Sequence, residues 1–505
     1  MKLTRLLKLL LGSFLSQGIS VITQLLVPPF FLRFYPNGLE VYGEWIALSA
    51  SVNYLGTLNY GIQTYSNNEM TILYNRGQVE EAKVVQASAF RLLLVLFVFF
   101  ALIGLLVFVL PIASMLKLRH ETSYVAAITL YLFILQIAFS MMFGLLANSY
   151  MVVGLLHRGS YMQSAQRLVS VLALAVGIYF RSSFPVLALI QLGALVVFFL
   201  VIMVDLKWIA PVLLPSLRYG NWKQVAAILK PSAHFGLIAI GGFLTWQGPV
   251  ILIQRVLGPS AVALFSLVRV VFQMSRQILS IASATIGQDI TILVGQGDYK
   301  QLRRLYDLSE RIVLFLIPVV SIGSLLLCPV LFAVWLHKRA LYSPLLCILM
   351  AVVSAVLGIK EHKTQFQSSS NEHEKLAVFI FWGYTSMLMV SVLTMKFYGL
   401  IGFMGTWLAW EMVQTWFVLH MNARLFPDGE TISTGPIVRL TVFMAVAFGL
   451  CIVPAYREAS WSLPMVVGSA VGITAVFGIA AYFVFDVDEL RELLMVRIRR
   501  RLIQA

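Results

Sequence analysis

The chain has 505 residues, of which 60% are apolar and only 12% are charged, and its formal net charge is +15. Soluble proteins contain roughly 45–50% apolar and about 25% charged residues, so this composition excludes a soluble protein and predicts an integral membrane protein. In such a chain Lys and Arg collect on the cytoplasmic side, and we expect no nucleic-acid partner because no basic stretch lies in a polar folded domain.

Apolar stretches long enough to cross a bilayer as helices follow one another along the whole sequence. We expect an all-α polytopic membrane protein with about 14 transmembrane helices, because each stretch is twice as long as a barrel strand and apolar on most faces. The first stretch continues without a small-residue cleavage site and predicts a membrane helix rather than a removed signal peptide. The fourteen stretches are 9–32, 42–65, 89–113, 124–148, 161–181, 184–204, 233–255, 262–286, 312–334, 342–359, 376–397, 402–423, 438–456 and 464–485.

Basic residues are distributed unevenly over the connecting loops. If the N-terminus is cytoplasmic, the inner loops, inner helix ends and tails contain 26 Lys and Arg, and the outer ones contain nine. This bias predicts that both termini are cytoplasmic, which requires an even number of helices, twelve or fourteen.

Two segments of the chain resemble each other. Residues 69–77 (EMTILYNRG) and 289–297 (DITILVGQG) match at an offset of 220, and a Gln-Gly pair with a later Gln recurs at an offset of 230. We therefore expect a duplicated six-helix unit in parallel pseudo-repeat around a central cleft, an arrangement typical of transporters. The expected parts are an N-terminal lobe (1–206), a cytoplasmic linker (207–232), a C-terminal lobe (233–424), two extra transmembrane helices (425–485) and a basic amphipathic cytoplasmic tail (486–505).

Three features together carry a family resemblance. They are the glutamines and proline pair of residues 16–45, an inner loop of the pattern NNEM…RG…EEA, and the repeated unit with a two-helix tail. The chain resembles the O-antigen or oligosaccharide flippases, the lipopolysaccharide/polysaccharide biosynthesis transporters of the multidrug/oligosaccharidyl-lipid/polysaccharide exporter superfamily.

The resemblance implies two helical lobes around a cleft that opens alternately to each side of the bacterial cell inner membrane. It implies a flippase that moves undecaprenyl-diphosphate-linked oligosaccharide from the cytoplasmic to the periplasmic leaflet. The implied partners are this polyprenyl-diphosphate-linked oligosaccharide, membrane lipids and the polysaccharide polymerase machinery, and no cofactor is implied.

Polar residues within the apolar stretches are the candidate site. Arg269, Gln273 and Arg276 share one helical face, and arginine inside a membrane helix normally faces an aqueous cavity. The guanidinium of arginine binds a diphosphate through charge-assisted hydrogen bonds, and amide side chains can hydrogen-bond to sugar hydroxyls. We assign to the substrate cleft Arg269, Gln273, Arg276, Gln17, Gln24, Gln247, Gln254, Arg255, Asn53 and Asn59. The prolines at 28–29 and 249 predict kinks or breaks in their helices.

Two acids are candidates for ion coupling. Glu411 is the lone acid in the middle of an apolar span, and Glu44 lies near the start of the second stretch. An intramembrane carboxylate is a functional hypothesis by default, so proton or sodium coupling is expected, with pairing to an arginine as the alternative for Glu411.

Signatures of catalysis are missing. The sequence has no Gly-Lys dipeptide, hence no Walker A loop, and it has no HExxH or GxSxG motif. We expect neither an enzyme nor a metal centre. The segment 360–375 (KEHKTQFQSSSNEHEK) is predicted to be a solvated, salt-bridged inner loop, and the three cysteines are predicted to be buried apolar residues.

Three alternative functions stay open. A lipid-linked peptidoglycan precursor flippase fits the same topology. A multidrug cation exporter shares the fold, but it needs acids in its cleft, and the arginine face favours an anionic cargo. A membrane glycosyltransferase, polymerase or ligase needs a catalytic outer loop, and the predicted outer loops are at most about a dozen residues long.

Overall fold

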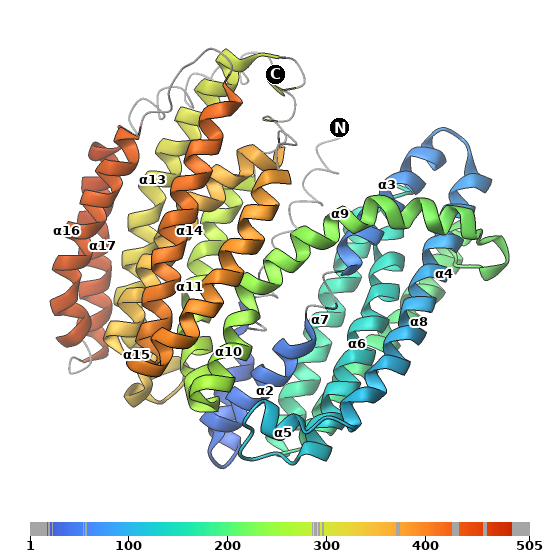
Figure 1. The fold of residues 1–505 in the computed structure, drawn as a ribbon, viewed down its shortest axis with the longest axis horizontal. Helices are drawn as coiled ribbons and strands as arrows, with labels where there is room; N and C mark the ends of the chain where they lie inside the picture. Colours follow the sequence, from blue (N-terminus) through green and yellow to red (C-terminus); the bar gives the residue numbers. More distant parts are fainter. Residues whose placement is uncertain are drawn as a thin grey trace. The chain divides into compact units, whose positions relative to one another are not determined.

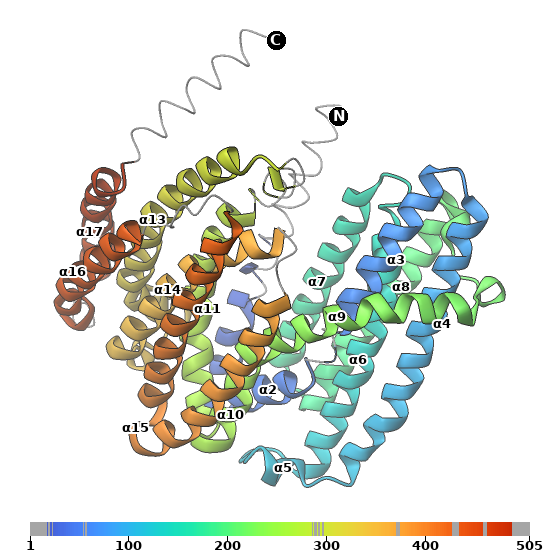
Figure 2. The same cartoon turned by 45° about the horizontal axis from the view of Figure 1, so that its top comes forward.

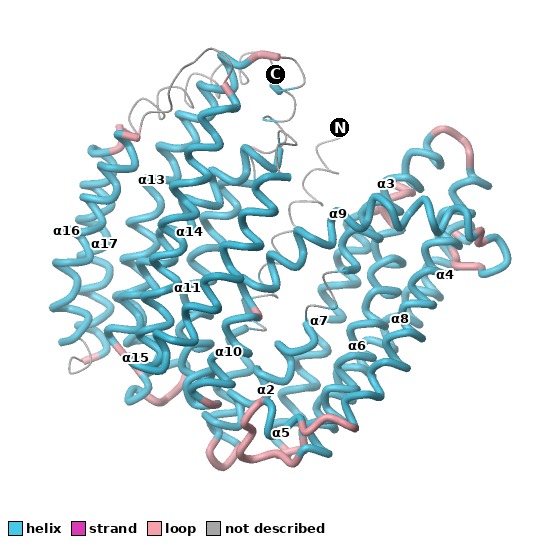
Figure 3. Tube along the Cα trace, in the orientation of Figure 1, coloured by secondary structure: helices cyan, strands magenta, loops and turns pink. Residues whose placement is uncertain are grey.

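The computed structural model describes residues 18, 21–22, 24–53, 55, 58–284, 286, 290, 293–294, 297–369, 374–426, 434–457 and 462–486. Within these residues the regular secondary structure is entirely helical (Figures 1 and 3). The helices form two compact units, Met1–Ala263 and Leu264–Ala505. The expected all-α polytopic fold is therefore confirmed.

The N-terminal unit is built around α6. The long helices α6 and α8 pack together through Phe143, Leu146 and Tyr150 on one side and Leu195 and Ile202 on the other, and Figure 2 shows them side by side. Helices α2, α4 and α7 also pack on α6, and α9 packs on α3 and α4. The helices of this unit are α2 (Gly38–Asn53), α3 (Leu58–Asn75), α4 (Val79–Gly104), α5 (Ile112–Met115), α6 (Ser123–Ser149), α7 (Leu156–Tyr179), α8 (Phe184–Ile209), α9 (Trp222–Trp246) and α10 (Gly248–Leu257), with α11 (Pro259–Ala284) beginning at its end.

The C-terminal unit contains most of α11 and all later helices. Helix α14 packs on α13 and α15, and the two last helices, α16 and α17, pack on α13, as Figure 1 shows for the yellow, orange and red elements. The helices are α13 (Tyr299–Val330, followed by a π-turn at Leu331–Trp335), α14 (Pro344–Ser369), α15 (Glu374–Asn422), α16 (Gly435–Arg457) and α17 (Leu463–Val484).

Ten of the fourteen predicted stretches fall in helices that can span a bilayer. Among the described residues nine helices are long and apolar enough to do so, and one of them, within α15, contains two predicted stretches. Gly399 separates those two at a positive φ of 58°, a conformation that glycine adopts at little cost.

The other four stretches differ from the prediction. Most of 9–32 lies outside the described residues, although 24–34 is helical straight through Pro28 and Pro29, so a break there was wrong. Stretch 42–65 is divided between α2 and α3, and 161–181 falls in α7 as far as Tyr179, a helix that is not among the nine. Stretch 233–255 is divided between α9 and α10 at Gln247, and Pro249 lies in the first turn of the new helix, where a break was expected.

The predicted linker, 207–232, is packed rather than loose. The backbone N–H of Asn221 donates to Ser88 Oγ of α4 at 2.9 Å, and the Arg91 guanidinium lies 5.6 Å from the centroid of the Trp222 ring. Because α9 also packs on α3 and α4, it belongs to the N-terminal unit. The contacts therefore divide the chain at 263/264, whereas we expected the second lobe to begin at 233.

The predicted inner loop 360–375 was wrong for its first ten residues. Residues 360–369 continue α14, with Lys360, His362, Lys363 and Gln367 buried. Nothing in 344–369 breaks a helix after Pro344, and four polar side chains at helical spacing find buried partners on α13 and α15.

The two matching loops close in the same way. Gly77 and Gly297 both have positive φ, 81° and 69°. The N–H of Gly77 donates to Tyr74 O and that of Gly297 to Val294 O, at 3.0 and 3.1 Å. The local repeat is thus present in the backbone, while duplication of the whole six-helix unit remains a prediction.

Candidate functional site

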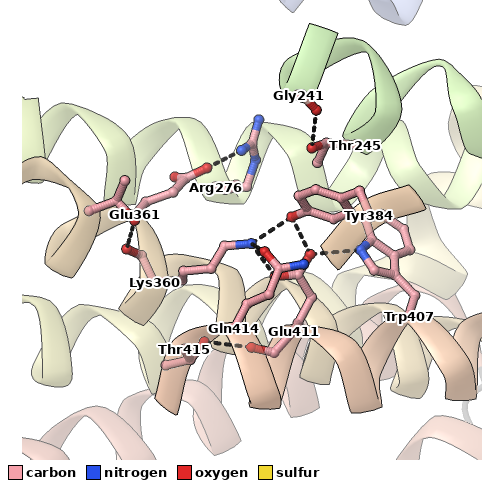
Figure 4. Close-up of polar contacts among 11 residues, drawn as sticks. Gly241, Thr245, Arg276, Lys360, Glu361, Tyr384, Trp407, Glu411, Gln414 and Thr415 are labelled. Carbon is pink, nitrogen blue, oxygen red and sulfur yellow. Dashed lines mark hydrogen bonds and ion pairs between the residues drawn. The ribbon is translucent and has the colours of Figure 1, made fainter. Parts of the chain in front are cut away.

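A buried ion pair lies in the interior of the C-terminal unit. Lys360 of α14 binds Glu411 of α15 through its ammonium group, and the two side chains are 8% and 0% exposed. The same carboxylate accepts from Tyr384 Oη at 2.5 Å and from Trp407 Nε1 at 2.9 Å (Figure 4). Of the two roles weighed for Glu411, pairing is therefore present, but the partner is a lysine rather than an arginine.

The Lys360 ammonium has three acceptors. Besides Glu411 Oε2, its Nζ donates to Tyr384 Oη at 2.5 Å and to Gln414 Oε1 at 3.2 Å. It also lies 4.9 Å from the centroid of the Tyr384 ring, within cation–π range. An ammonium has three N–H donors, so this arrangement satisfies all of them.

The next residue of α14 belongs to a second ion pair. Glu361 Oε1 accepts from Arg276 Nη1 of α11. Figure 4 shows Lys360 extending toward Tyr384 and Glu411 while Glu361 extends toward Arg276. The Arg276 and Glu361 side chains are 18% and 25% exposed, so this pair is less buried than the Lys360 pair.

A third pair lies one turn further along α14. Lys363 Nζ donates to Glu310 Oε1 of α13 at 2.5 Å and lies 3.9 Å from the centroid of the Tyr306 ring. The Lys363 carbonyl accepts from Asn422 Nδ2 at 2.9 Å, and Gln367 donates to Asn422 Oδ1 at 2.7 Å. All of these side chains are buried.

Sequence reasoning missed Lys360, Lys363, Gln367 and their partners. One signal was available, because residues 360, 363 and 367 repeat at i, i+3 and i+7, the spacing of one helical face. We ended the preceding helix at 359 because charged residues begin there, although a run of charges can continue a helix when its partners lie on neighbouring helices.

The arginine face of α11 is present. Arg269, Gln273 and Arg276 are half-buried, and the Arg269 guanidinium lies 5.3 Å from the centroid of the Phe265 ring. Phe265 in turn packs on Trp407, the residue that binds Glu411, with ring centroids 6.0 Å apart. Arg276 therefore contacts Glu361 of α14. Arg269 contacts Phe265, which packs on the Glu411 partner Trp407.

Three predicted site residues meet in the N-terminal unit, around the loop that follows α5. Glu44 Oε1 accepts from the backbone N–H groups of Arg119 and His120 at 2.5 and 3.1 Å. Gln254 donates to Leu116 O at 2.7 Å, and Arg255 donates to Ser114 O at 2.9 Å. These hydrogen bonds hold residues 114–120, the end of α5 and the loop after it, against α2 and α10.

Glu40 also binds this loop through its carboxylate. It accepts from Arg119 Nη1 at 3.0 Å and Ser260 Oγ at 2.9 Å, and its other oxygen lies 2.7 Å from His120 Nε2. The hydrogen bond with His120, and after it the one from Ser260, lower the pKa of Glu40 below its usual value. Glu40, Glu44, Arg119, His120 and Ser260 therefore form one hydrogen-bonded group.

The remaining predicted residues are spread over the N-terminal unit. Gln24 is half-buried in the helical segment 24–34, Gln247 is half-buried at the turn between α9 and α10, and Asn53 is exposed at the end of α2. Asn59 lies in the first turn of α3, and Gln17 falls outside the described residues.

The N-terminal unit also contains an amide cluster that the sequence did not indicate. Asn148 Nδ2 donates to Gln63 Oε1 at 3.3 Å, and Gln163 Nε2 donates to Asn148 Oδ1 at 3.2 Å. The three residues come from α6, α3 and α7 and are half-buried. Such amides offer both donors and acceptors, as sugar hydroxyls require.

An apolar hollow of 760 Å³ lies away from these polar groups, between α13 and α17. Phe315, Leu327, Ile479 and Phe483 are among its lining side chains, and Gly323 and Gly478 widen it. Its lining suits hydrocarbon rather than sugar or phosphate.

Comparisons with known proteins agree on the fold. No protein-family model matches the sequence, and no curated protein matches it. The solved structure "Lipid II flippase MurJ, inward closed conformation" is similar with a TM-score of 0.70 at 12% identity, over 96% of this chain and 100% of that one. An inward-facing multidrug resistance MATE family transporter of the MOP superfamily is similar with a TM-score of 0.65 at 15% identity, over 82% and 96%.

A third structure, an outward-facing conformation of a multidrug resistance MATE family transporter, has a TM-score of 0.55 at 15% identity over 83% of this chain and 96% of that one. At these identities the likeness concerns the fold alone. The chain is a multi-pass membrane protein with the two-lobe fold of the MATE and MurJ transporters of the MOP superfamily.

Proposed function

We propose that the protein is an alternating-access flippase of the bacterial inner membrane that moves an undecaprenyl-diphosphate-linked oligosaccharide to the outer leaflet. The observation that supports this most is the pair of half-buried arginines, Arg269 and Arg276, within a membrane-spanning segment of α11. Guanidinium groups bind diphosphate oxygens through charge-assisted hydrogen bonds, and the amide cluster of the N-terminal unit matches the needs of a sugar.

The acids of the C-terminal unit argue against a cationic cargo. Glu310 and Glu411 lie in spanning helices, and each binds a buried lysine of the same unit. A multidrug cation exporter needs a carboxylate that can meet its substrate, and these two are buried and already paired within the protein.

Arg276 is the residue that the proposal assigns to the diphosphate. Its ion pair with Glu361 is partly exposed, and the planar guanidinium matches the geometry of phosphate oxygens. The apolar hollow on α13 and α17 offers a surface for part of a polyprenyl chain.

A lipid-linked peptidoglycan precursor is the second candidate cargo. It has the same polyprenyl-diphosphate group, and the MurJ likeness extends over the whole length of that protein. The two cargoes differ in their sugars, so the arginines alone do not separate them.

The test is complementation. Surface polysaccharide should return when the protein is expressed in cells that lack their own oligosaccharide flippase, and neither growth of cells depleted of their peptidoglycan precursor flippase nor drug resistance of exporter-deficient cells should be rescued. Rescue of growth alone would select the second candidate, and resistance alone would refute an anionic cargo.

Variants at matched expression locate the cargo site. Loss of hydrogen bonds to a charged group costs about 1.5–3 kcal/mol, so Arg276→Ala should reduce export about 10- to 100-fold, whereas Arg276→Lys should retain part of it because the charge remains. Glu361→Gln is the matched control and should retain most export. Equal losses in Arg276→Ala and Glu361→Gln would mean that only the ion pair matters.

A further inference from the structure

The environment of the Lys360 ammonium is that of a bound cation. Three oxygen atoms and one aromatic face meet at this point, because Glu411 and Gln414 supply carbonyl-type oxygens and Tyr384 supplies both its hydroxyl and its ring. All three partner side chains are buried. Carboxylate, amide and hydroxyl oxygens are also the ligands of hard metal cations.

We infer that this is a cation site whose occupant is the protein's own lysine, so that Lys360 takes the place that a free monovalent cation would take. The inference stands on contacts within the C-terminal unit and does not depend on the cargo.

The orientation of Gln414 supports this assignment. Its Oε1 faces the ammonium, while its buried Nε2 has no hydrogen-bond partner among the described residues. An ammonium has donors and no acceptor, so the amide turns its oxygen toward Lys360, and this leaves a buried donor unpaired at a cost in free energy.

Both oxygens of the Glu411 carboxylate have hydrogen-bond partners. Glu411 Oε2 meets the ammonium, and Glu411 Oε1 accepts from both Tyr384 Oη and Trp407 Nε1. An exchanging ion would have to displace a lysine that is covalently tethered to α14, so Glu411 holds a fixed internal cation instead of exchanging a proton or a sodium ion.

Truncation of the lysine should turn the site into one for free cations. Lys360→Ala removes three methylene groups and the ammonium, which together equal n-propylammonium. The experiment measures thermal unfolding of purified, detergent-solubilised protein with n-propylammonium chloride or NaCl, against tetramethylammonium chloride at the same ionic strength. Tetramethylammonium has no N–H donors and controls for salt.

The inference predicts a saturable rise in the Tm of Lys360→Ala with n-propylammonium or Na⁺, of about 3 °C or more at tenfold excess over the Kd. Wild type should show no such rise, because its site is filled. The control Lys360→Ala/Glu411→Leu should show none either, because it lacks the carboxylate.

Two results would overturn the inference. One is a Lys360→Ala variant whose Tm neither cation raises above the tetramethylammonium value. The other needs no change at Lys360, and so remains available if Lys360→Ala does not fold: a Na⁺-specific rise in the Tm of wild type that Glu411→Leu abolishes would mean that an ion binds at this carboxylate beside Lys360. Neither result bears on the export assay, so the flippase proposal is tested separately.

Discussion

Lys360 and Glu361 are neighbours on α14, and their two ion pairs should differ greatly in their effect on stability. Glu411→Gln leaves the Lys360 ammonium in a site where the two side chains are 8% and 0% exposed. Breaking a buried pair on one side costs about 3–5 kcal/mol. Arg276→Ala acts on a pair with 18% and 25% exposure, which is less desolvated, so we expect a smaller cost of about 1 kcal/mol.

These free energies translate into separable melting temperatures. For a unit of about this size 1 kcal/mol shifts Tm by roughly 2–4 °C. We therefore expect a decrease of about 6–20 °C for Glu411→Gln and of about 2–4 °C for Arg276→Ala. Thermal unfolding in detergent, followed by tryptophan fluorescence, measures both, since Trp407 donates to Glu411 itself.

The double variant Lys360→Met/Glu411→Leu is the control for charge. It removes both ions and leaves apolar side chains of similar size, which is often neutral or stabilising, so its Tm should lie closer to wild type than that of Glu411→Gln. Equal decreases in Glu411→Gln and Arg276→Ala would refute the reasoning, because exposure would then not decide the cost.

Three further predictions concern the rest of the chain. Arg76→Cys and Lys300→Cys lie in exposed positions beside the two repeated turns and should be labelled by a membrane-impermeant maleimide only in inverted vesicles, so labelling in intact cells would contradict the cytoplasmic assignment of both loops. The pKa of Glu40 is lowered in the folded protein, so the ionised carboxylate stabilises the fold at a pH above its usual pKa of about 4.5, and this stabilisation is lost as pH falls through the lowered pKa. Glu40→Gln should therefore have a lower Tm than wild type at pH 7. A difference in Tm that persists at pH 3 would exclude the carboxylate as its cause. Gly399→Ala meets open space but requires a positive φ, so it should destabilise α15 by about 1–2 kcal/mol, and an unchanged Tm would show that the bend does not need glycine.

The sequence alone predicted the class of the molecule, most of its spanning helices and the arginine face of α11. These features follow from composition and from the spacing of apolar residues, because a bilayer requires about 20 apolar residues in each helix and makes a buried arginine costly wherever it lies. The matching segments that end at Gly77 and Gly297 were also recognised in the sequence, and the structure gives both glycines a positive φ, which glycine adopts at little cost.

The partners of the charges were decided only by the tertiary structure. Glu411 was identified from its position in an apolar span, yet Lys360 lies 51 residues away on another helix, and we placed it in a solvated loop. Likewise Glu44 was expected to couple an ion, and Gln254 and Arg255 were expected to face a cleft. All three instead make hydrogen bonds with backbone groups of 114–120. Local propensity reveals that a polar group lies in an apolar helix, but which donor or acceptor satisfies it depends on helix packing over long sequence distances.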